Sequence, residues 1–232
     1  MIFIEIGNTN IKFVKDTIEE IVVLPATRKN LIKVLKLNEQ KFILNSNHKF
    51  DLFFSKKKLR QKYWLFNIDN YKSDFNFFEN IDINEIGYDL LFLSLFIKTK
   101  INSDCLLISN GTCLTSILKL NNKIVSISIG LGFNTANLIL KNKFGFIYQQ
   151  DLKIKFGNNT NHAINLHQIY TIEGIIEVNK KILDNNFKII LTGNGFNNEW
   201  FEYVSSKYQN VDFIANLTLL MFREWILKKI LK

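Results

Sequence analysis

Cysteine, proline and histidine are scarce in this chain of 232 residues, which contains two, one and three of them respectively. Two cysteines supply too few ligands for a structural zinc site, and we expect Cys105 and Cys113 to be buried thiols without a redox role. His162 and His167 are five positions apart, which is a poor spacing for binding one metal ion together, and His48 lies in a polar stretch. The histidines are therefore expected to be structural or surface residues.

Long apolar runs are also missing. The longest, "LLFLSLFI", covers about half of a membrane span and is followed closely by Lys98 and Lys100. No basic region precedes the apolar residues at the N-terminus, as a signal peptide would require. We therefore expect a cytoplasmic protein without a membrane partner. Its 47% hydrophobic and 22% charged residues are enough to bury the core of one large domain or two small ones.

Acidic residues are outnumbered by basic ones, and the net charge is +9. The lysines are scattered, however, and the one tight cluster is "KKKLRQK" at residues 56–62. A basic cluster of this kind is typical of a solvated face. The aromatic residues are mostly Phe and do not alternate with basic residues, so we expect them in the core. A nucleic-acid partner is not expected, but a basic nucleic-acid-binding accessory protein stays open as an alternative.

Glycine turns and apolar segments give the chain an internal repeat. Residues 2–6 and 10–14 are predicted strands joined by a Gly-Asn turn, followed by a strand ending at Pro25, a helix after Thr27, short strands at "KFILN" and "YWLFN", and a buried helix from Asn84 to Lys98. Residues 105–130 again predict strand, glycine turn and strand. Ile4–Thr9 aligns with Ile108–Cys113 without a gap, which predicts a duplicated α/β fold with a cleft between its halves.

The second half continues with a predicted long helix at residues 161–183, a buried strand "FKIILTG" running into "GNG", and an amphipathic closing helix at residues 217–231. We expect an N-terminal domain at residues 1–100 and a C-terminal domain at residues 101–232. No low-complexity segment and no linker rich in proline, glycine or serine separates the two domains in the sequence.

The first glycine turn has the chemistry of a phosphate site. Glu5 ends a predicted buried strand and is followed by Gly7-Asn8-Thr9, which together offer backbone N–H groups, a hydroxyl and a carboxylate able to hold Mg²⁺. The turn at Gly111-Thr112 is in register in the repeat, so two facing loops would hold one phosphate chain. A third loop, "TGNG" at residues 192–195, would receive the base or ribose of a nucleotide. The alternative is a plain hairpin in which Glu5 points to solvent.

Several of these stretches resemble the type III pantothenate kinases: "EIGNTNIKF", "IGYD" at residues 86–89, "NGTCLT" at 110–115, "NTNHAI" at 159–164 and "ILTGNG" at 190–195. The resemblance implies a duplicated actin-like (ribonuclease H-like) ATPase fold, each domain having a mixed sheet flanked by helices. It also implies a homodimer that transfers the γ-phosphoryl group of ATP to pantothenate, the first step towards coenzyme A. The cofactors implied are Mg²⁺ and a monovalent cation, K⁺ or NH₄⁺.

The resemblance also implies a role for each matching residue. Asp89 is the implied general base for the pantothenate hydroxyl, and Glu5 and Ser109 fall on metal positions. The remaining positions are Gly7, Asn8, Thr9, Lys12, Gly111, Thr112 and Thr115 for the ATP phosphates, Gly193 and Gly195 for the nucleotide loop, and Gly87, Tyr88 and Thr160 for substrate.

The sequence departs from the family at charged positions. Glu5 replaces an aspartate, which moves the carboxylate outward by a methylene, whereas Ser109 replaces an aspartate and weakens the expected cation site. Leu90 replaces an arginine whose guanidinium would bind an anionic group through two parallel hydrogen bonds. A degenerate homologue that binds nucleotide or pantothenate without turnover is therefore a second hypothesis. Apart from the resemblance, Asp89 is also suited to satisfying a helix N-terminus.

Overall fold

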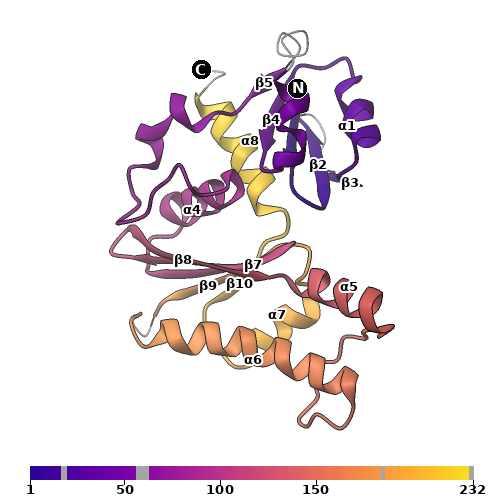
Figure 1. Ribbon diagram of the computed structural model, residues 1–232. Helices are drawn as coiled ribbons and strands as arrows, with labels where there is room; N and C mark the ends of the chain where they lie inside the picture. The colour runs from indigo at the N-terminus through magenta and orange to yellow at the C-terminus, as the bar shows by residue number, and fades with distance from the viewer. Residues whose placement is uncertain (17–19, 56–62, 184–185, 230–232) are drawn as a thin grey trace. The chain divides into compact units, whose positions relative to one another are not determined.

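The computed structural model describes residues 1–16, 20–55, 63–183 and 186–229 (Figure 1). The basic cluster at residues 56–62 lies outside the described residues. The chain forms two compact units: unit 1 comprises Met1–Asn76, Asp82–Phe96 and the residues from Leu217 onward, and unit 2 comprises Phe77–Ile81 and Ile97–Asn216. The chain thus leaves unit 1 near residue 96 and returns to it at Leu217. The division into functional halves at residue 100 stays a prediction.

Unit 1 is built on a mixed sheet of five strands. They are β1 (Ile2–Ile6), β2 (Asn10–Lys15), β3 (Val22–Pro25), β4 (Lys41–Asn45) and β5 (Trp64–Leu65). The order across the sheet is β3-β2-β1-β4-β5. Strand β2 runs antiparallel to β1, as the glycine turn predicts, and β4 runs parallel to it. All five residues of the central strand β1 are buried.

The helical segments that belong wholly or mainly to unit 1 are α1 (Arg28–Leu35), η1 (His48–Phe50), α2 (Asp51–Phe54), η2 (Ile68–Asn70), η3 (Lys72–Phe75), α4 (Tyr88–Lys100) and α8 (Leu217–Lys229). Thr27 caps α1, its hydroxyl accepting a hydrogen bond from the Asn30 N–H at 3.2 Å. Helix α4 begins at Tyr88 rather than at Asn84. The reason is local, because the Asp82 side chain binds the Asn84 N–H at 2.9 Å in a separate turn.

Helix α8 is held in unit 1 by aromatic contacts. The ring of Trp225 lies 5.6 Å from that of Phe66 and 5.7 Å from that of Phe92, and Phe222 lies 5.3 Å from Phe92. Trp225 Nε1 donates a hydrogen bond to Asp74 Oδ2 at 2.9 Å, so the polar end of the indole is also satisfied. The last helix of the chain therefore completes the core of the unit that contains its first strand.

Unit 2 is built on a second mixed sheet. Its strands are β6 (Cys105–Asn110), β7 (Cys113–Leu120), β8 (Lys123–Leu131), β9 (Lys188–Thr192) and β10 (Val211–Phe213), and its helices are α5 (Phe133–Phe144), α6 (Thr160–Lys180) and α7 (Asn198–Ser205). Helices α6 and α7 lie along one face of this sheet (Figure 1). Ile172 and Ile176 of α6 and Trp200 of α7 pack there in one buried cluster with Ile108 and Leu191 of the sheet.

The two sheets confirm the predicted duplication. The order in unit 2 is β10-β9-β6-β7-β8, so in both sheets the first strand is central, the second is antiparallel to it and the fourth is parallel to it. The aligned segments Ile4–Thr9 and Ile108–Cys113 occupy the same place, the end of the central strand and the turn after it. The fold class predicted from the repeat, an α/β protein with two mixed sheets flanked by helices, is observed.

Three details differ from expectation. Helix α5 was not predicted, because its N-cap is Gly132, which has no side chain to signal a helix start. The strand expected at "YWLFN" extends only over Trp64–Leu65. Cys113 is exposed rather than buried, whereas Cys105 is buried and its burial raises the pKa of the thiol to about 12.

Among the described residues, no helix is both long and apolar enough to cross a bilayer.

Replacing Trp225 by alanine is expected to destabilise unit 1. The indole is 5% exposed, and removing a buried aromatic side chain of this kind costs about 3–5 kcal/mol. Urea unfolding, followed by circular dichroism, measures the change in free energy. Lys228→Ala, an exposed substitution on the same helix, is the control and should have little effect. Equal stability of the two variants would contradict the assignment of α8 to this core.

Candidate functional site

Glu5 is the most deeply buried carboxylate of the candidate site. It lies on β1 with 6% of its surface exposed, so the hypothesis that it points to solvent is wrong. The antiparallel register places Glu5 opposite Lys12 of β2, and Lys12 Nζ lies 3.5 Å from Glu5 Oε2. This separation is too long for a strong charge-assisted hydrogen bond. Glu5 Oε2 therefore keeps acceptor capacity inside a buried site.

The charges around Glu5 act on one another. Burial raises the pKa of the Glu5 carboxyl, the Lys12 ammonium opposes that rise, and the carboxylate of Asp89 adds to it. Burial likewise raises the pKa of Asp89, while hydrogen bonds from the backbone of Leu90 and Asp89 itself oppose the rise. The structure thus brings three sequence-predicted residues, Glu5, Lys12 and Asp89, within electrostatic reach.

The turn after β1 is fixed by its backbone. Gly7 N–H donates to Asn10 O at 2.9 Å, and Thr9 O accepts from Ala26 N–H at 2.8 Å. Asn47, which is 1% exposed, donates from Nδ2 to Gly7 O at 3.0 Å. Sequence reasoning missed Asn47, which lies two residues after β4 and whose partner Gly7 is 40 positions away. The side chains of Asn8 and Thr9 are exposed at the tip of this anchored turn.

Asp89 lies in the first turn of α4, and its surroundings leave room for the carboxylate. A Cβ atom at Gly87 would lie 2.6 Å from Asp89 Oδ1, so a side chain there would displace the carboxylate from its present position. Asp89 N–H donates to Ser46 Oγ at 3.2 Å, which ties the helix start to the residue after β4. The ring of Tyr88 packs edge-on against Phe66 at 5.0 Å. Leu90, at the position of the family arginine, is 5% exposed and part of the core.

In unit 2, the two predicted glycine loops lie together. Gly195 N–H donates to Asn110 O at 2.7 Å, at the end of β6 where the Gly111-Thr112 turn begins. Gly193 has a φ of +94°, a conformation that favours glycine, and a Cβ atom there would lie 2.4 Å from Asn110 O. Thr112 O accepts a hydrogen bond from Gly132 N–H at 3.1 Å, so the start of α5 joins the same cluster.

Ser109 lies among hydroxyls rather than charges. It is half-buried, opposite Thr115 on β7 and beside Thr192 on β9. Thr115 and Thr192 are 6% and 2% exposed. No group of three or more His, Cys, Asp or Glu residues able to hold a metal occurs among the described residues. The described part of this unit therefore offers a cation only neutral oxygens at Ser109, a weaker ligand set than the carboxylate found in the family.

Thr160 is the exposed first residue of α6. The capping interaction there is made by Asn159, whose Oδ1 accepts from His162 N–H at 2.9 Å. The side chain of the neighbouring Asn161 holds the backbone of Gln149, accepting from its N–H at 2.9 Å and donating to its carbonyl at 3.0 Å. The structure thus places Thr160 beside the segment that leads from α5 to α6.

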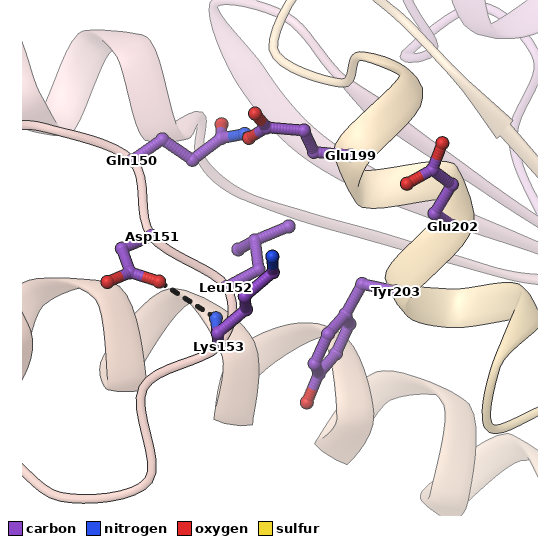
Figure 2. A pocket seen from close by; sticks show the side chains of 7 residues that line it. All are labelled: Gln150, Asp151, Leu152, Lys153, Glu199, Glu202 and Tyr203. Atoms are coloured by element: carbon purple, nitrogen blue, oxygen red, sulfur yellow. Dashed lines mark hydrogen bonds between the residues drawn. The ribbon is translucent and has the colours of Figure 1, made fainter.

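A cavity of about 540 Å³ opens between that segment and α7 (Figure 2). Figure 2 shows the Gln150 side chain reaching towards Glu199, to whose Oε2 it donates at 2.5 Å. None of the sequence-predicted site residues lines the cavity. Sequence reasoning missed it because the segment carries no periodic pattern. The lining residues are Gln150, Asp151, Leu152, Lys153, Glu199, Glu202 and Tyr203.

Several solved structures have a fold similar to that of this chain. A Campylobacter jejuni protein assigned to the Baf family of transcriptional activators matches with a TM-score of 0.65 and 17% identity over 99% of this chain and 98% of its own. A Sinorhizobium meliloti protein assigned as a 2-dehydro-3-deoxygalactonokinase matches with a TM-score of 0.59 and 8% identity, covering 99% and 96%. The apo pSK41 ParM protein matches with a TM-score of 0.51 and 12% identity, covering 98% and 97%.

No protein-family model matches the sequence, and no curated protein matches it. The two sheets of equal strand order, together with these structural likenesses, define the two-domain actin-like ATPase fold. At such low identities the likenesses establish the fold and leave the chemistry to be argued from the residues.

Replacing Lys12 by methionine is expected to destabilise the protein, because it leaves the Glu5 carboxylate buried without its cation. Breaking a buried pair costs roughly 3–5 kcal/mol. The loss raises the folded-state pKa of Glu5 further above its ordinary value of 4.5, so the destabilisation is largest at high pH, where the carboxylate is charged, and it shrinks as the pH falls and the buried Glu5 becomes protonated.

Urea unfolding at neutral and at acidic pH measures this effect. Lys15→Met is the matched control, because Lys15 lies on the same strand in a half-exposed pair with Glu39 and should change the free energy of unfolding by only about 0.2–1 kcal/mol. A Lys12→Met cost that did not depend on pH would contradict the role given to Glu5.

Proposed function

We propose that the chain is an ATP-dependent phosphotransferase whose acceptor is pantothenate, giving 4′-phosphopantothenate. The single observation that carries the proposal is that the buried carboxylate of Glu5, beside the anchored glycine turn, lies within electrostatic reach of the half-buried carboxylate of Asp89 at the start of α4. Phosphoryl transfer needs a metal-holding carboxylate and a second acid near the acceptor hydroxyl. The sequence resemblance to type III pantothenate kinases supplies the particular acceptor.

In this proposal Asp89 accepts the proton of the acceptor hydroxyl as its oxygen forms a bond to the γ-phosphorus of ATP, while the bond from that phosphorus to the bridging oxygen breaks and ADP leaves. Burial raises the pKa of Asp89 and makes the carboxylate a stronger base than an exposed aspartate. The Gly87 backbone leaves space at its Oδ1. Gly87 and Tyr88 are proposed to line the acceptor side, with Thr160 as a further substrate contact.

The residues of unit 1 fit a divalent cation. Glu5 offers a buried carboxylate oxygen that no strong hydrogen bond occupies, and oxygen of this type is the ligand that Mg²⁺ prefers. Glu5 would hold Mg²⁺, which neutralises charge on the phosphate oxygens when bound. Lys12 Nζ lies 3.5 Å from the same oxygen, and with Mg²⁺ held by Glu5 the lysine would be available to a phosphate oxygen.

The glycine residues of each unit are proposed to bind the nucleotide. Gly7, Asn8 and Thr9 offer an anchored turn in unit 1, and Gly111, Thr112 and Thr115 offer its counterpart in unit 2, with Gly193 and Gly195 beside it. Ser109 supplies a neutral oxygen for a monovalent cation, K⁺ or NH₄⁺. Because this ligand is weak, we expect activation at high rather than low concentrations of that cation.

The burial of Leu90 bears on the acceptor. The core position of this leucine leaves the carboxylate of pantothenate without the arginine that the family provides. We therefore expect poor discrimination between pantothenate and pantetheine, which carries the same hydroxyl but no carboxylate. The same observation, together with the neutral Ser109, favours the second candidate function, a homologue that binds these ligands without turnover.

Release of ADP from Mg-ATP is the direct test. We expect release that depends on pantothenate or pantetheine and is higher in K⁺ or NH₄⁺ buffer than in Na⁺ buffer. Asp89→Asn should lower kcat by about 10²–10⁴-fold, the usual contribution of a general base, and leave the affinity for Mg-ATP nearly unchanged. Asp51→Asn, which alters an exposed carboxylate in the same unit, is the control.

The pH dependence distinguishes a base from a structural acid. Because the pKa of Asp89 is raised, kcat/KM should rise with pH through an acidic limb above the ordinary aspartate value of 3.8. Nucleotide binding without ADP release under any of these conditions would reject the kinase and leave the binding protein. No nucleotide binding would reject both.

We also propose a homodimer formed through unit 2. Strand β8 is an edge of its sheet and exposes Ile129 and Leu131, and the helix after it exposes Leu138 and Phe144. Each of these four side chains is more than half exposed, at 64%, 54%, 56% and 64%. Residues 77–79 hydrogen-bond to β8 at Ile124, and the apolar residues Ile129 and Leu131 lie beyond that point. A sheet edge that carries exposed apolar side chains is suited to pairing with a second copy of itself.

Replacing Leu138 by glutamate is expected to convert the dimer to a monomer, because it places a charge on that apolar face. Light scattering after gel filtration measures the mass. Leu52→Glu is the matched control, since Leu52 is 82% exposed in unit 1 and its change should leave the mass of the assembly as it is. A wild-type protein that runs as a monomer at all concentrations would contradict the proposal.

A further inference from the structure

Asn110 is a buried asparagine whose side chain joins three segments of unit 2. It is the last residue of β6 and is 0% exposed. Its Nδ2 donates to Gly195 O at 3.1 Å, and its Oδ1 accepts from the N–H of Phe133, the first residue of α5, at 3.1 Å. Both functions of the amide are thus used, one on the nucleotide loop and the other on a helix start.

The fold by itself does not require a polar residue at this position. In the repeat, Asn110 aligns with Ile6, a fully buried apolar residue at the end of β1. The backbone bond is common to both units, since Ile6 O accepts from Ser46 N–H at 2.9 Å just as Asn110 O accepts from Gly195 N–H. The side-chain bonds of Asn110 are therefore an addition specific to unit 2.

The neighbouring glycines are fitted closely around this asparagine. A Cβ atom at Gly195 would lie 2.5 Å from Asn110 Cγ, and one at Gly193 would lie 2.4 Å from Asn110 O. Neither distance is compatible with a side chain at the glycine position. The "TGNG" loop thus packs directly on Asn110, because Gly193 and Gly195 have no side chain that would come between the loop and the asparagine.

The helix start is joined to the first glycine turn as well. Thr112 O accepts from Gly132 N–H at 3.1 Å and from Thr135 Oγ1 at 3.0 Å. A Cβ atom at Gly132 would lie 2.1 Å from Gly111 O. The turn, the loop and the first turn of α5 consequently form one assembly, and Asn110 is the side chain that all of it surrounds.

We propose that Asn110 is a positioning residue that holds these three segments as one preassembled nucleotide cradle. Its amide contacts the protein rather than the ligand, and it acts by fixing the backbone groups that face the nucleotide. The inference rests on the proposed function in that the ligand is a nucleotide. Only an uncharged group with both a donor and an acceptor satisfies Gly195 O and Phe133 N–H together.

Two variants test the donor and the acceptor of the Asn110 amide separately. Asn110→Leu has nearly the same size but neither a donor nor an acceptor, so both contacts are lost. Asn110→Asp keeps an acceptor for Phe133 N–H but turns a carboxylate towards Gly195 O. Asn165→Leu is the matched control, because Asn165 is also 0% exposed and makes its hydrogen bonds with Tyr148, Gln149, Asp151 and Asn161 instead.

Amide hydrogen exchange by NMR and calorimetric titration with Mg-ADP are the two measurements. We expect faster exchange at Phe133 in Asn110→Leu but not in Asn110→Asp or Asn165→Leu. We expect the Kd for Mg-ADP to rise about 10–100-fold in both Asn110 variants, corresponding to the loss of one or two buried hydrogen bonds, and to stay within a few-fold in Asn165→Leu.

The outcomes separate this inference from the proposed function. Wild-type protein that does not bind Mg-ADP would overturn the proposed function, and the nucleotide cradle with it. Wild-type protein that binds, together with folded Asn110 variants that bind equally well, would overturn the inference alone. If Asn110→Leu does not fold, Asn110→Asp decides the question by its Kd.

Discussion

A strand that is buried on both faces can present chemistry only where it ends. In each sheet of this protein the central strand is of that kind, and its neighbours fix its end in place by backbone hydrogen bonds. Glu5 and Gly7 lie at one such end, and Ser109 and Gly111 lie at the other. The candidate chemistry of both units therefore depends on one constraint, the burial of two short apolar strands.

The two ends have diverged in charge while keeping their geometry. In unit 1 the register pairs Glu5 with Lys12, a buried ion pair, whereas in unit 2 Ser109 faces Thr115, a pair of hydroxyls. A carboxylate binds a divalent cation far more strongly than a hydroxyl does. The proposed metal site therefore falls in one copy of the duplicated scaffold, and the other copy presents backbone, hydroxyl and amide groups.

The sequence was sufficient for features that repeat or that follow local rules. The first antiparallel hairpin, the glycine turns and the helix cap at Thr27 could all be predicted, because each depends on nearby residues. Asn47 and Asn110 could not, since their partners Gly7 and Gly195 lie 40 and 85 positions away. Helix α5 was missed for want of a capping side chain at Gly132. Buried polar residues with distant partners are beyond pattern reading from one sequence.

The return of the last helix to the first unit has a consequence for biosynthesis. Because α8 supplies Trp225 and Phe222 to the aromatic core, unit 1 lacks part of its core until residues 217–229 have been synthesised. The second unit, whose residues are continuous except for one short segment, is complete earlier in translation. The first sheet therefore still exposes the apolar surface that α8 covers after the residues of unit 2 have been made, and exposed surface of this kind is prone to aggregation.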